Sequence, residues 1–155
     1  MSFPTPQTIA TQIKTLALLD TTSAITTGKA TEWDGADFAA ADLPAIVVLP
    51  GAGRYQRADA GQYLVTRAFL LTLYVSIVPT VGETVKIQAT VRQAVLPYLT
   101  SIPAYWAQPK LARLSAFTGV MDSDLDTDTG VDITSLNETS YSAAQWVMTV
   151  TYRVR

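Results

Sequence analysis

The segment from Gln62 to Val78 constrains the fold of this chain more than any other stretch of its sequence. Successive strand side chains point to opposite faces, and here one face would be mainly apolar and the other mixed. The mainly apolar face would carry Tyr63, Val65, Arg67, Phe69, Leu71, Leu73, Val75 and Ile77. A buried helix is the alternative, but it would spread these apolar side chains around its whole circumference. The alternation therefore predicts the central strand of an antiparallel or mixed sheet.

Helical spacing and capping signals predict two helices. Thr5 can cap the first helix, and Pro6 fits its first turn, where the missing N–H donor is not needed. The second helix is expected over Glu83–Thr100. Pro97 in its last turn and Pro103 after it indicate where this helix kinks or ends.

Apolar runs and alternation predict three further strands. Leu43–Pro50 is a short apolar run bounded by prolines, and Lys110–Phe117 and Ala143–Arg155 alternate at period two. The segment Gly51–Gly61 contains three glycines and two arginines, which indicates an exposed, mobile hairpin connection. The two strands that flank this connection are expected to pair antiparallel.

The predicted order of elements is helix, strand, strand, helix, strand, strand. This order favours an α+β two-layer sandwich, in which a four-stranded, mainly antiparallel sheet has two helices packed on one face. The length of 155 residues suits a single domain over residues 1–155. Residues 20–42 form a long flexible connection, which either holds a short β element around Ala24–Trp33 or gains order on assembly. Residues 121–132, MDSDLDTDTGVD, are expected to form an acidic loop with a turn at Gly130.

The chain contains no cysteine and no histidine. These absences exclude disulfides, thiolate nucleophiles and a Ser–His–Asp triad, so we expect no enzymatic activity, no catalytic residue and no cofactor. A carboxylate-based hydrolase remains the alternative from a different class. The net charge of −2 argues against sequence-specific nucleic-acid binding, and the lack of a long apolar run argues against a membrane partner. Because the N-terminus has no signal-peptide pattern, we expect the protein to stay where it is made.

Six residues are candidates for contact with a partner: Arg54, Tyr55, Arg57, Asp124, Asp126 and Asp128. Arginine and tyrosine are enriched at the centres of protein interfaces. Two solvated charges on a hairpin are an equally open interpretation. Arg67 lies on the apolar face of the long strand, so it needs either a nearby carboxylate or a place at the rim of the sheet. Trp106 either anchors a partner or covers the edge of the core.

The acidic segment also resembles a calcium-binding loop in part. Its aspartates at positions 122, 124, 126 and 128 alternate like the oxygen ligands of a helix–loop–helix calcium site. The glycine that should follow the third ligand is replaced by Thr127 or Thr129. The bidentate glutamate at the twelfth position is replaced by Ile133 or Ser135. We therefore expect no metal ligand here, with a calcium-binding module kept as an alternative.

In its order of parts, the sequence resembles the tail terminator (tail completion) proteins of long-tailed bacteriophages, of the lambda minor tail protein U type. An amphipathic N-terminal helix is followed by LPAIVVLPGAGRYQ, which contains a strand and a glycine-rich hairpin. TRAFLLTLYVSIV, LPYLTSIPAY and AAQWVMTVTYRV then supply the long strand, the end of the second helix and the last strand. The resemblance covers most residues from Pro4 to Val154.

The resemblance implies a non-enzymatic virion protein that forms a ring, a homohexamer, at the head-proximal end of a tail tube. The ring would terminate polymerisation of the tube and provide the surface for head attachment. The implied partners are further copies of the chain, the tail tube protein and a neck or head-completion protein. The implied location is the virion, at the head–tail junction, after assembly in the host cytoplasm. A neck connector on the portal side is the alternative within this class.

In such a ring, Arg54 and Arg57 are expected to meet the acidic segment Asp122–Asp128 of a neighbouring subunit. Charge at such contacts chiefly sets specificity and register. A contact between two different patches of each subunit is also what a closed ring requires.

Overall fold

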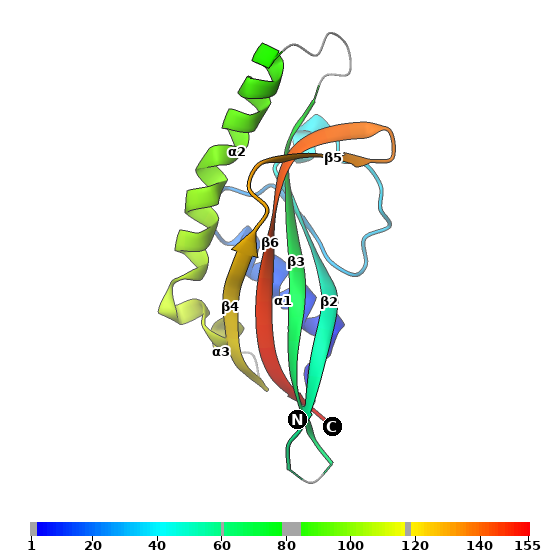
Figure 1. Cartoon of the computed structure of the whole chain (residues 1–155), viewed down its shortest axis with the longest axis vertical. Helices are drawn as coiled ribbons and strands as arrows, with labels where there is room; N and C mark the ends of the chain where they lie inside the picture. The colour runs from blue at the N-terminus through cyan, green and yellow to red at the C-terminus, as the bar shows by residue number, and fades with distance from the viewer. Residues whose placement is uncertain (1–2, 60, 79–84, 117–118) are drawn as a thin grey trace.

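The computed structural model describes residues 3–59, 61–78, 85–116 and 119–155, and it has an α+β fold (Figure 1). The strands form one mixed, six-stranded sheet with the order β1-β2-β3-β6-β4, and β5 pairs with β6 beyond the end of β4. The elements are α1 (Pro6–Leu18), β1 (Thr27–Lys29), η1 (Ala40–Asp42), β2 (Ala45–Arg57), β3 (Tyr63–Ile77), α2 (Val85–Trp106), η2 (Pro109–Leu111), α3 (Arg113–Ala116), β4 (Val120–Asp128), β5 (Asp132–Leu136) and β6 (Thr139–Val154).

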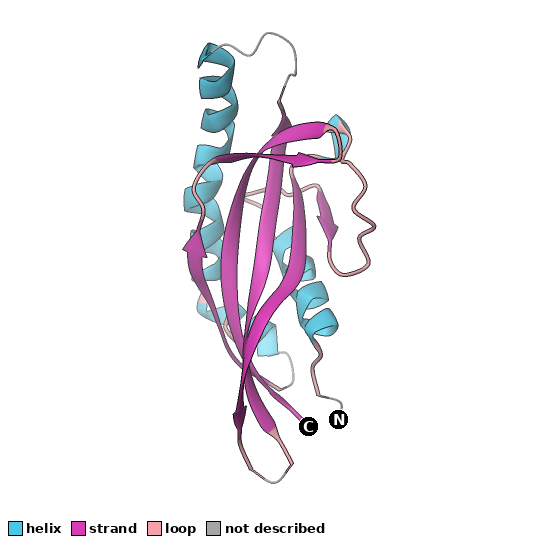
Figure 2. Ribbon diagram, turned by 45° about the vertical axis from the view of Figure 1, so that its right-hand side comes forward, coloured by secondary structure: helices cyan, strands magenta, loops and turns pink. Residues whose placement is uncertain are grey.

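The α+β class is confirmed, whereas the prediction of four strands and two helices is wrong in its details. The short strands β1 and β5 extend the sheet, and β1 pairs parallel to β2, which makes the sheet mixed. β1 also confirms the alternative that placed a short β element near Ala24–Trp33. Strands of three and five residues carry too little alternation to be recognised from sequence. Figure 2 shows the helices α1 and α2 on one side of the sheet.

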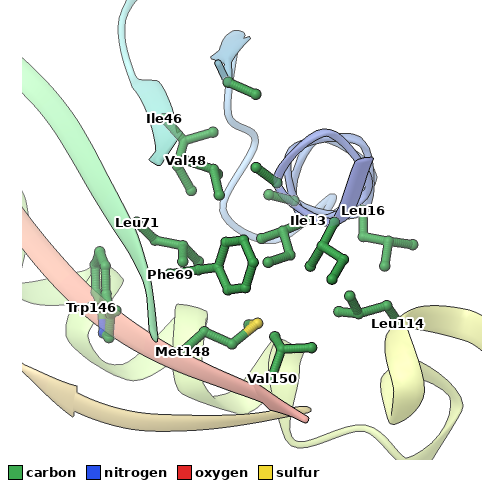
Figure 3. Close-up of a cluster of buried hydrophobic side chains, with 14 of the residues drawn as sticks. Ile13, Leu16, Ile46, Val48, Phe69, Leu71, Leu114, Trp146, Met148 and Val150 are labelled. Carbon is green, nitrogen blue, oxygen red and sulfur yellow. The ribbon is translucent and has the colours of Figure 1, made fainter. Parts of the chain in front are cut away.

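The long strand lies at the centre of the sheet, as predicted. β3 pairs antiparallel with β2 on one side and with β6 on the other. Phe69, Leu71 and Leu73 are fully buried beneath the helices. Ile13 of α1 points toward Phe69 in the core, and Leu16 lies on the side of Leu114 (Figure 3). Each fully buried apolar side chain of this size stabilises the fold by about 1.5–3 kcal/mol.

The first helix begins as the sequence predicts. The backbone N–H of Thr8 donates to Oγ1 of Thr5 over 3.1 Å, the N–H of Thr5 donates to Oγ1 of Thr8 over 2.8 Å, and Pro6 is the first residue of α1. The expected apolar stripe is buried over Ile9, Ile13 and Leu16. Leu19 lies beyond the helix end and is 65% exposed.

The second helix is longer than predicted, because α2 runs through both prolines and ends at Trp106. A proline removes only its own N–H donor, and packing of the flanking turns can hold the helix together. Ile102 lies between the two prolines and is 1% exposed. Tyr105 donates a hydrogen bond from its hydroxyl to the carbonyl of Leu16. These contacts keep the last turns of α2 on α1 and on the sheet.

Lys110–Phe117 is not a strand, which corrects the sequence prediction. The chain forms η2 and the single turn α3 there, and Phe117 lies outside the described residues. Leu111 and Leu114 are both buried, so the effective apolar spacing is three rather than two. Arg113, Leu114 and Ser115 adopt φ of 57°, 52° and 61°, a left-handed turn that costs about 1–2 kcal/mol per residue. Burial of the Leu114 side chain offsets part of this cost.

The acidic segment is mostly a strand rather than a loop, which corrects the prediction for residues 121–132. β4 pairs antiparallel with β6 and carries Asp124, Asp126 and Asp128 on extended backbone. Gly130, two residues after β4, adopts φ of 70°. The chain does not reverse there, because β4 and β5 both pair antiparallel with β6, so the turn predicted at Gly130 is wrong. Because acidic residues occupy alternate positions of β4, its sequence has few of the alternating apolar residues by which a strand is recognised. Val120, buried at the start of β4, and Leu125 hold the strand against the core.

The glycine-rich connection is also mostly strand. β2 continues to Arg57, and the turn that joins it to β3 is closed by a hydrogen bond from Ala58 N to Gln62 O over 3.0 Å. The predicted antiparallel pairing of the flanking strands is confirmed. The sequence prediction of a hairpin over Gly51–Gly61 is therefore wrong for residues 51–57. A bulge between Pro50 and Gly53 lets the strand accommodate these glycines without ending.

The face of the sheet opposite the helices is only partly covered. Phe38, from the connection before β2, packs there on Val47, Tyr74 and Tyr141. The hydroxyl of Tyr141 donates to the Phe38 carbonyl over 2.9 Å and accepts from its N–H over 3.0 Å. The rest of this face is polar or half-buried and is called the open face below; its residues include Thr66, Leu70, Thr72, Val147, Thr149 and Thr151.

Candidate functional site

All six predicted partner residues lie on β2 and β4, the strands that flank the central pair β3 and β6. β1 pairs with β2 only at residues 45–47, so within the described chain the outer edge of β2 from Val48 to Arg57 has no strand partner. β4 pairs with β6 alone, which leaves its other edge without a strand partner among the described residues. Figure 1 shows β2 and β4 on opposite sides, with β3 and β6 between them. Open edges of this kind can pair with another chain.

The β2 edge is basic. Arg54 and Arg57 are exposed, and Tyr55 between them is 57% exposed. Arg54 is opposite Thr66, so its side chain belongs to the open face of the sheet. Tyr55 and Arg57 are opposite Val65 and Tyr63, on the face that carries the helices. The two arginines therefore emerge from opposite faces of one strand edge.

Arg67 supports this edge from the neighbouring strand. Its guanidinium donates three hydrogen bonds, to Tyr152 Oη over 3.0 Å, to Gly51 O over 2.8 Å and to Tyr55 Oη over 2.9 Å. The hydrogen bond that Arg67 donates to Tyr152 Oη is the main cause that raises the pKa of Arg67. A Cβ on Gly53 would lie 2.8 Å from the Arg67 Cζ, so only glycine leaves room for the guanidinium.

Of the two alternatives predicted for Arg67, the nearby carboxylate is not found among the described residues. Three neutral oxygens accept its hydrogen bonds, and the described residues place no acidic side chain on it. The charge is compensated by tyrosine hydroxyls and a backbone carbonyl instead. The guanidinium also lies 5.9 Å from the centre of the Tyr55 ring, within the range of a cation–π contact. Sequence reasoning missed this support, although an arginine on an apolar strand near two glycines is a usable signal.

The β4 edge is acidic. Asp122 and Asp124 are opposite Thr151 and Thr149 and belong to the open face, whereas Asp128 is opposite Trp146 on the helix face. Asp126 lies at a break in the register between Leu125 and Thr127. Asp124, Asp126 and Asp128 are all exposed. No cation among the described residues forms an ion pair with them.

The sheet keeps the two charged edges apart within one subunit. Arg54, Thr66, Thr151 and Asp122 form a single row across the four strands. With neighbouring strands about 4.8 Å apart, the ends of this row are separated by about 14 Å. The basic and acidic candidates therefore cannot neutralise each other in one chain. Arg54 and Asp122 lie at the same level of the sheet, and the two edges face outward in opposite directions.

The arrangement of the aspartates gives no support to a calcium site. Along β4 their side chains are distributed over both faces of extended backbone instead of surrounding one point. No group of three metal-binding side chains occurs within residues 3–59, 61–78, 85–116 and 119–155. Within the same residues, no helix is both long and apolar enough to cross a lipid bilayer.

Comparison with known proteins gives no assignment. The sequence matches no model of a known protein family, and no curated protein matches it. The functional interpretation therefore rests on the geometry of the two edges and on the residues described above.

Proposed function

We propose that this protein is a virion assembly protein that forms a ring at the head-proximal end of a phage tail tube. The ring ends polymerisation of the tube and provides the surface to which the head attaches through its neck. One observation carries the proposal: a single sheet has two free edges, at the same level and of opposite charge. The order of sequence segments that resembles the tail terminator proteins gives the proposal its biological setting.

Opposite edges on one subunit suit head-to-tail association. A contact between two different patches leaves one patch of each kind free, so copies keep adding until a ring closes. Six copies are the number that the resemblance implies. Complementary charges favour the correct neighbour and disfavour contact between two like edges. Assembly of this kind needs no catalytic residue and no cofactor, which agrees with a chain that lacks histidine and cysteine.

The proposal is tested by light scattering and by electron microscopy of tail tubes. Tubes assembled from tail tube protein alone should lengthen without a fixed end. Addition of this protein should stop growth and leave a ring at one end of each tube. A protein that is monomeric in isolation and assembles only on the tube also fits, because the tube can template the ring. A protein that stays monomeric and binds neither tubes nor necks would contradict the proposal.

A further inference from the structure

A pocket of about 350 Å³ lies between the end of α2 and the acidic edge strand β4. Its wall on the helix side is formed by the last turn of α2, and its wall on the sheet side by the acidic half of β4. The lining residues are Pro103, Trp106, Ala107, Asp124, Leu125, Asp126, Thr127, Asp128 and Trp146. The pocket therefore combines two indole rings with three carboxylates.

Two hydrogen-bond donors of this pocket have no acceptor. The indole Nε1 atoms of Trp106 and Trp146 are both buried, and no described residue accepts a hydrogen bond from either. The Trp146 side chain is 1% exposed, so its donor is removed from bulk solvent. A buried donor without an acceptor destabilises a protein by about 1–3 kcal/mol. In the described part of the chain these two donors are unpaired, which favours a ligand that supplies hydrogen-bond acceptors.

The charge around the pocket is negative. Asp124 and Asp126 have no hydrogen-bond or ion-pair partner in the described part of the chain, and one oxygen of Asp128 accepts from Gly130 N over 2.8 Å. The C-terminal end of a helix carries partial negative charge, and the last turn of α2 has no basic residue to offset it. A fitting ligand therefore supplies hydrogen-bond acceptors together with positive charge.

We propose that the β2 edge of a second copy, residues 51–57, adds to β4 and completes this pocket. The segment Gly51-Ala-Gly-Arg-Tyr-Gln-Arg is extended, basic and rich in carbonyl and hydroxyl acceptors. β2 and β4 run antiparallel to each other, because three antiparallel pairings separate them. A second copy in the same orientation thus places its β2 antiparallel to β4, and the sheet continues across the contact.

The side chains match face by face in this arrangement. Arg54 of the added strand emerges on the open face, where Asp122 and Asp124 of the receiving strand lie. In the antiparallel register that puts Arg54 beside Asp124, Gly51–Gly53 of the added strand lie beside Leu125–Thr127 at the pocket, and Tyr55 and Arg57 emerge on the helix face near Ser123 and Met121. The Arg67 hydrogen bonds hold the added strand in its extended form before contact, which reduces the ordering cost of association.

The contact is tested with a peptide of residues 51–57, blocked at both ends, titrated into a Trp33→Phe/Arg54→Gln/Arg57→Gln receptor. Trp33 stacks on Phe38 away from the pocket, so its removal leaves Trp106 and Trp146 as the only fluorescent indoles. The arginine substitutions stop the receptor's own β2 from competing. The expected result is a saturable change in tryptophan fluorescence that weakens as salt is added.

Two receptor variants assign the binding to the pocket. Asp124→Asn/Asp126→Asn should lower the affinity for the peptide about fivefold. Trp106→Phe removes one hydrogen-bond donor but keeps an aromatic ring, and it should lower the affinity about threefold. Asp59→Asn/Glu138→Gln removes the same charge at exposed positions away from the pocket and should leave the affinity unchanged. Circular dichroism of each receptor verifies that it is folded.

Absence of saturable binding would overturn the proposed contact. Equal binding of a peptide with both arginines replaced by glutamate, or no effect of either pocket variant, would overturn it as well. The contact between β2 and β4 rests on the self-association proposed above, but separate results would contradict the contact and the tail function. Peptide binding without any effect on tail tubes would contradict the tail function alone, and tube capping without peptide binding would contradict the contact alone.

Discussion

The two free edges of the sheet differ in what holds their charged residues. On the basic edge, Tyr55 and Gly51 are fixed by hydrogen bonds from Arg67. On the acidic edge, Asp124 and Asp126 have no partner in the described chain. The basic edge is therefore shaped from within the subunit, whereas the acidic edge carries charge that no described residue compensates.

Because of this difference, we expect the β2 edge to affect the stability of the subunit and the β4 edge to affect the association of subunits. Substitutions in the support of the β2 edge should lower the stability of the isolated subunit. Removal of the β4 carboxylates should leave that stability almost unchanged and should act on association alone. The following predictions test this division in order of decreasing effect on the free energy of unfolding.

Arg67→Met should have the largest effect. It removes three hydrogen bonds of a half-buried guanidinium and leaves the hydroxyl of Tyr152, a residue 1% exposed, without its donor. We expect the free energy of unfolding to fall by about 2 kcal/mol, measured by urea denaturation. Arg54→Met, at an exposed position of the same edge, is the matched control and should change it by less than about 0.5 kcal/mol. Equal effects of the two variants would refute the supporting role of Arg67.

Gly53→Ala should have the next largest effect. The new Cβ would lie 2.8 Å from Arg67 Cζ and would displace the guanidinium from its acceptors. We expect a loss of about 1 kcal/mol in the wild-type background and almost none in the Arg67→Met background. A double-mutant cycle measures this coupling. Additive effects would mean that the glycine is needed for another reason.

Glu32→Gln, at a position away from both edges, measures how much an exposed ion pair contributes to the free energy of unfolding. Lys14 Nζ and Glu32 Oε1 are 3.1 Å apart, in a pair whose acid is about half exposed. Hydrogen bonds from the Glu32 backbone and from Lys14 lower the pKa of Glu32. A lowered folded-state pKa stabilises the fold above the unfolded pKa, and this contribution disappears as the pH falls through the folded pKa.

For this exposed pair we expect Glu32→Gln to lower the free energy of unfolding by about 0.3 kcal/mol at neutral pH. The difference between wild type and variant should vanish at a pH below both pKa values. A difference that persists there would assign the effect to the size or packing of the side chain, not to its charge.

Asp124→Asn/Asp126→Asn should have the smallest effect on the isolated subunit. Because no described residue pairs with either carboxylate, the free energy of unfolding should change by less than about 0.3 kcal/mol. Urea denaturation of dilute protein measures this change. A loss as large as that of Arg67→Met would show that the acidic edge has an internal structural role.

Elements with strong local signals could be predicted from the sequence. Thr5 and Pro6 start α1 because capping depends on neighbouring residues alone. β3 and β6 carry long apolar alternation, and both are strands. The loop prediction for β4 is wrong because acidic residues alternate along this strand and its apolar contacts come from β6. The prediction of a strand at Lys110–Phe117 is wrong because Leu111 and Leu114, the buried apolar residues, are three positions apart, which is a helical spacing.

The candidate site could be predicted only as residues, not as an arrangement. Arg54, Arg57 and the acidic segment are visible in the sequence as exposed charge. Their positions on opposite edges depend on the order of β2, β3, β6 and β4, which long-range pairing decides. The orphaned donors of Trp106 and Trp146 likewise arise only when α2 is packed beside β4.

The most direct test of the account is a charge-exchange experiment on the association of two variants. Arg54→Glu/Arg57→Glu makes both edges of a subunit acidic, and Asp122→Lys/Asp124→Lys/Asp126→Lys makes the β4 edge net basic, like the β2 edge. Light scattering, with and without tail tubes, measures each variant alone and the equimolar mixture. The account predicts that neither variant assembles alone and that the mixture restores assemblies with alternating subunits. Normal assembly of either variant alone, or a mixture that does not assemble although both variants are folded, would contradict it.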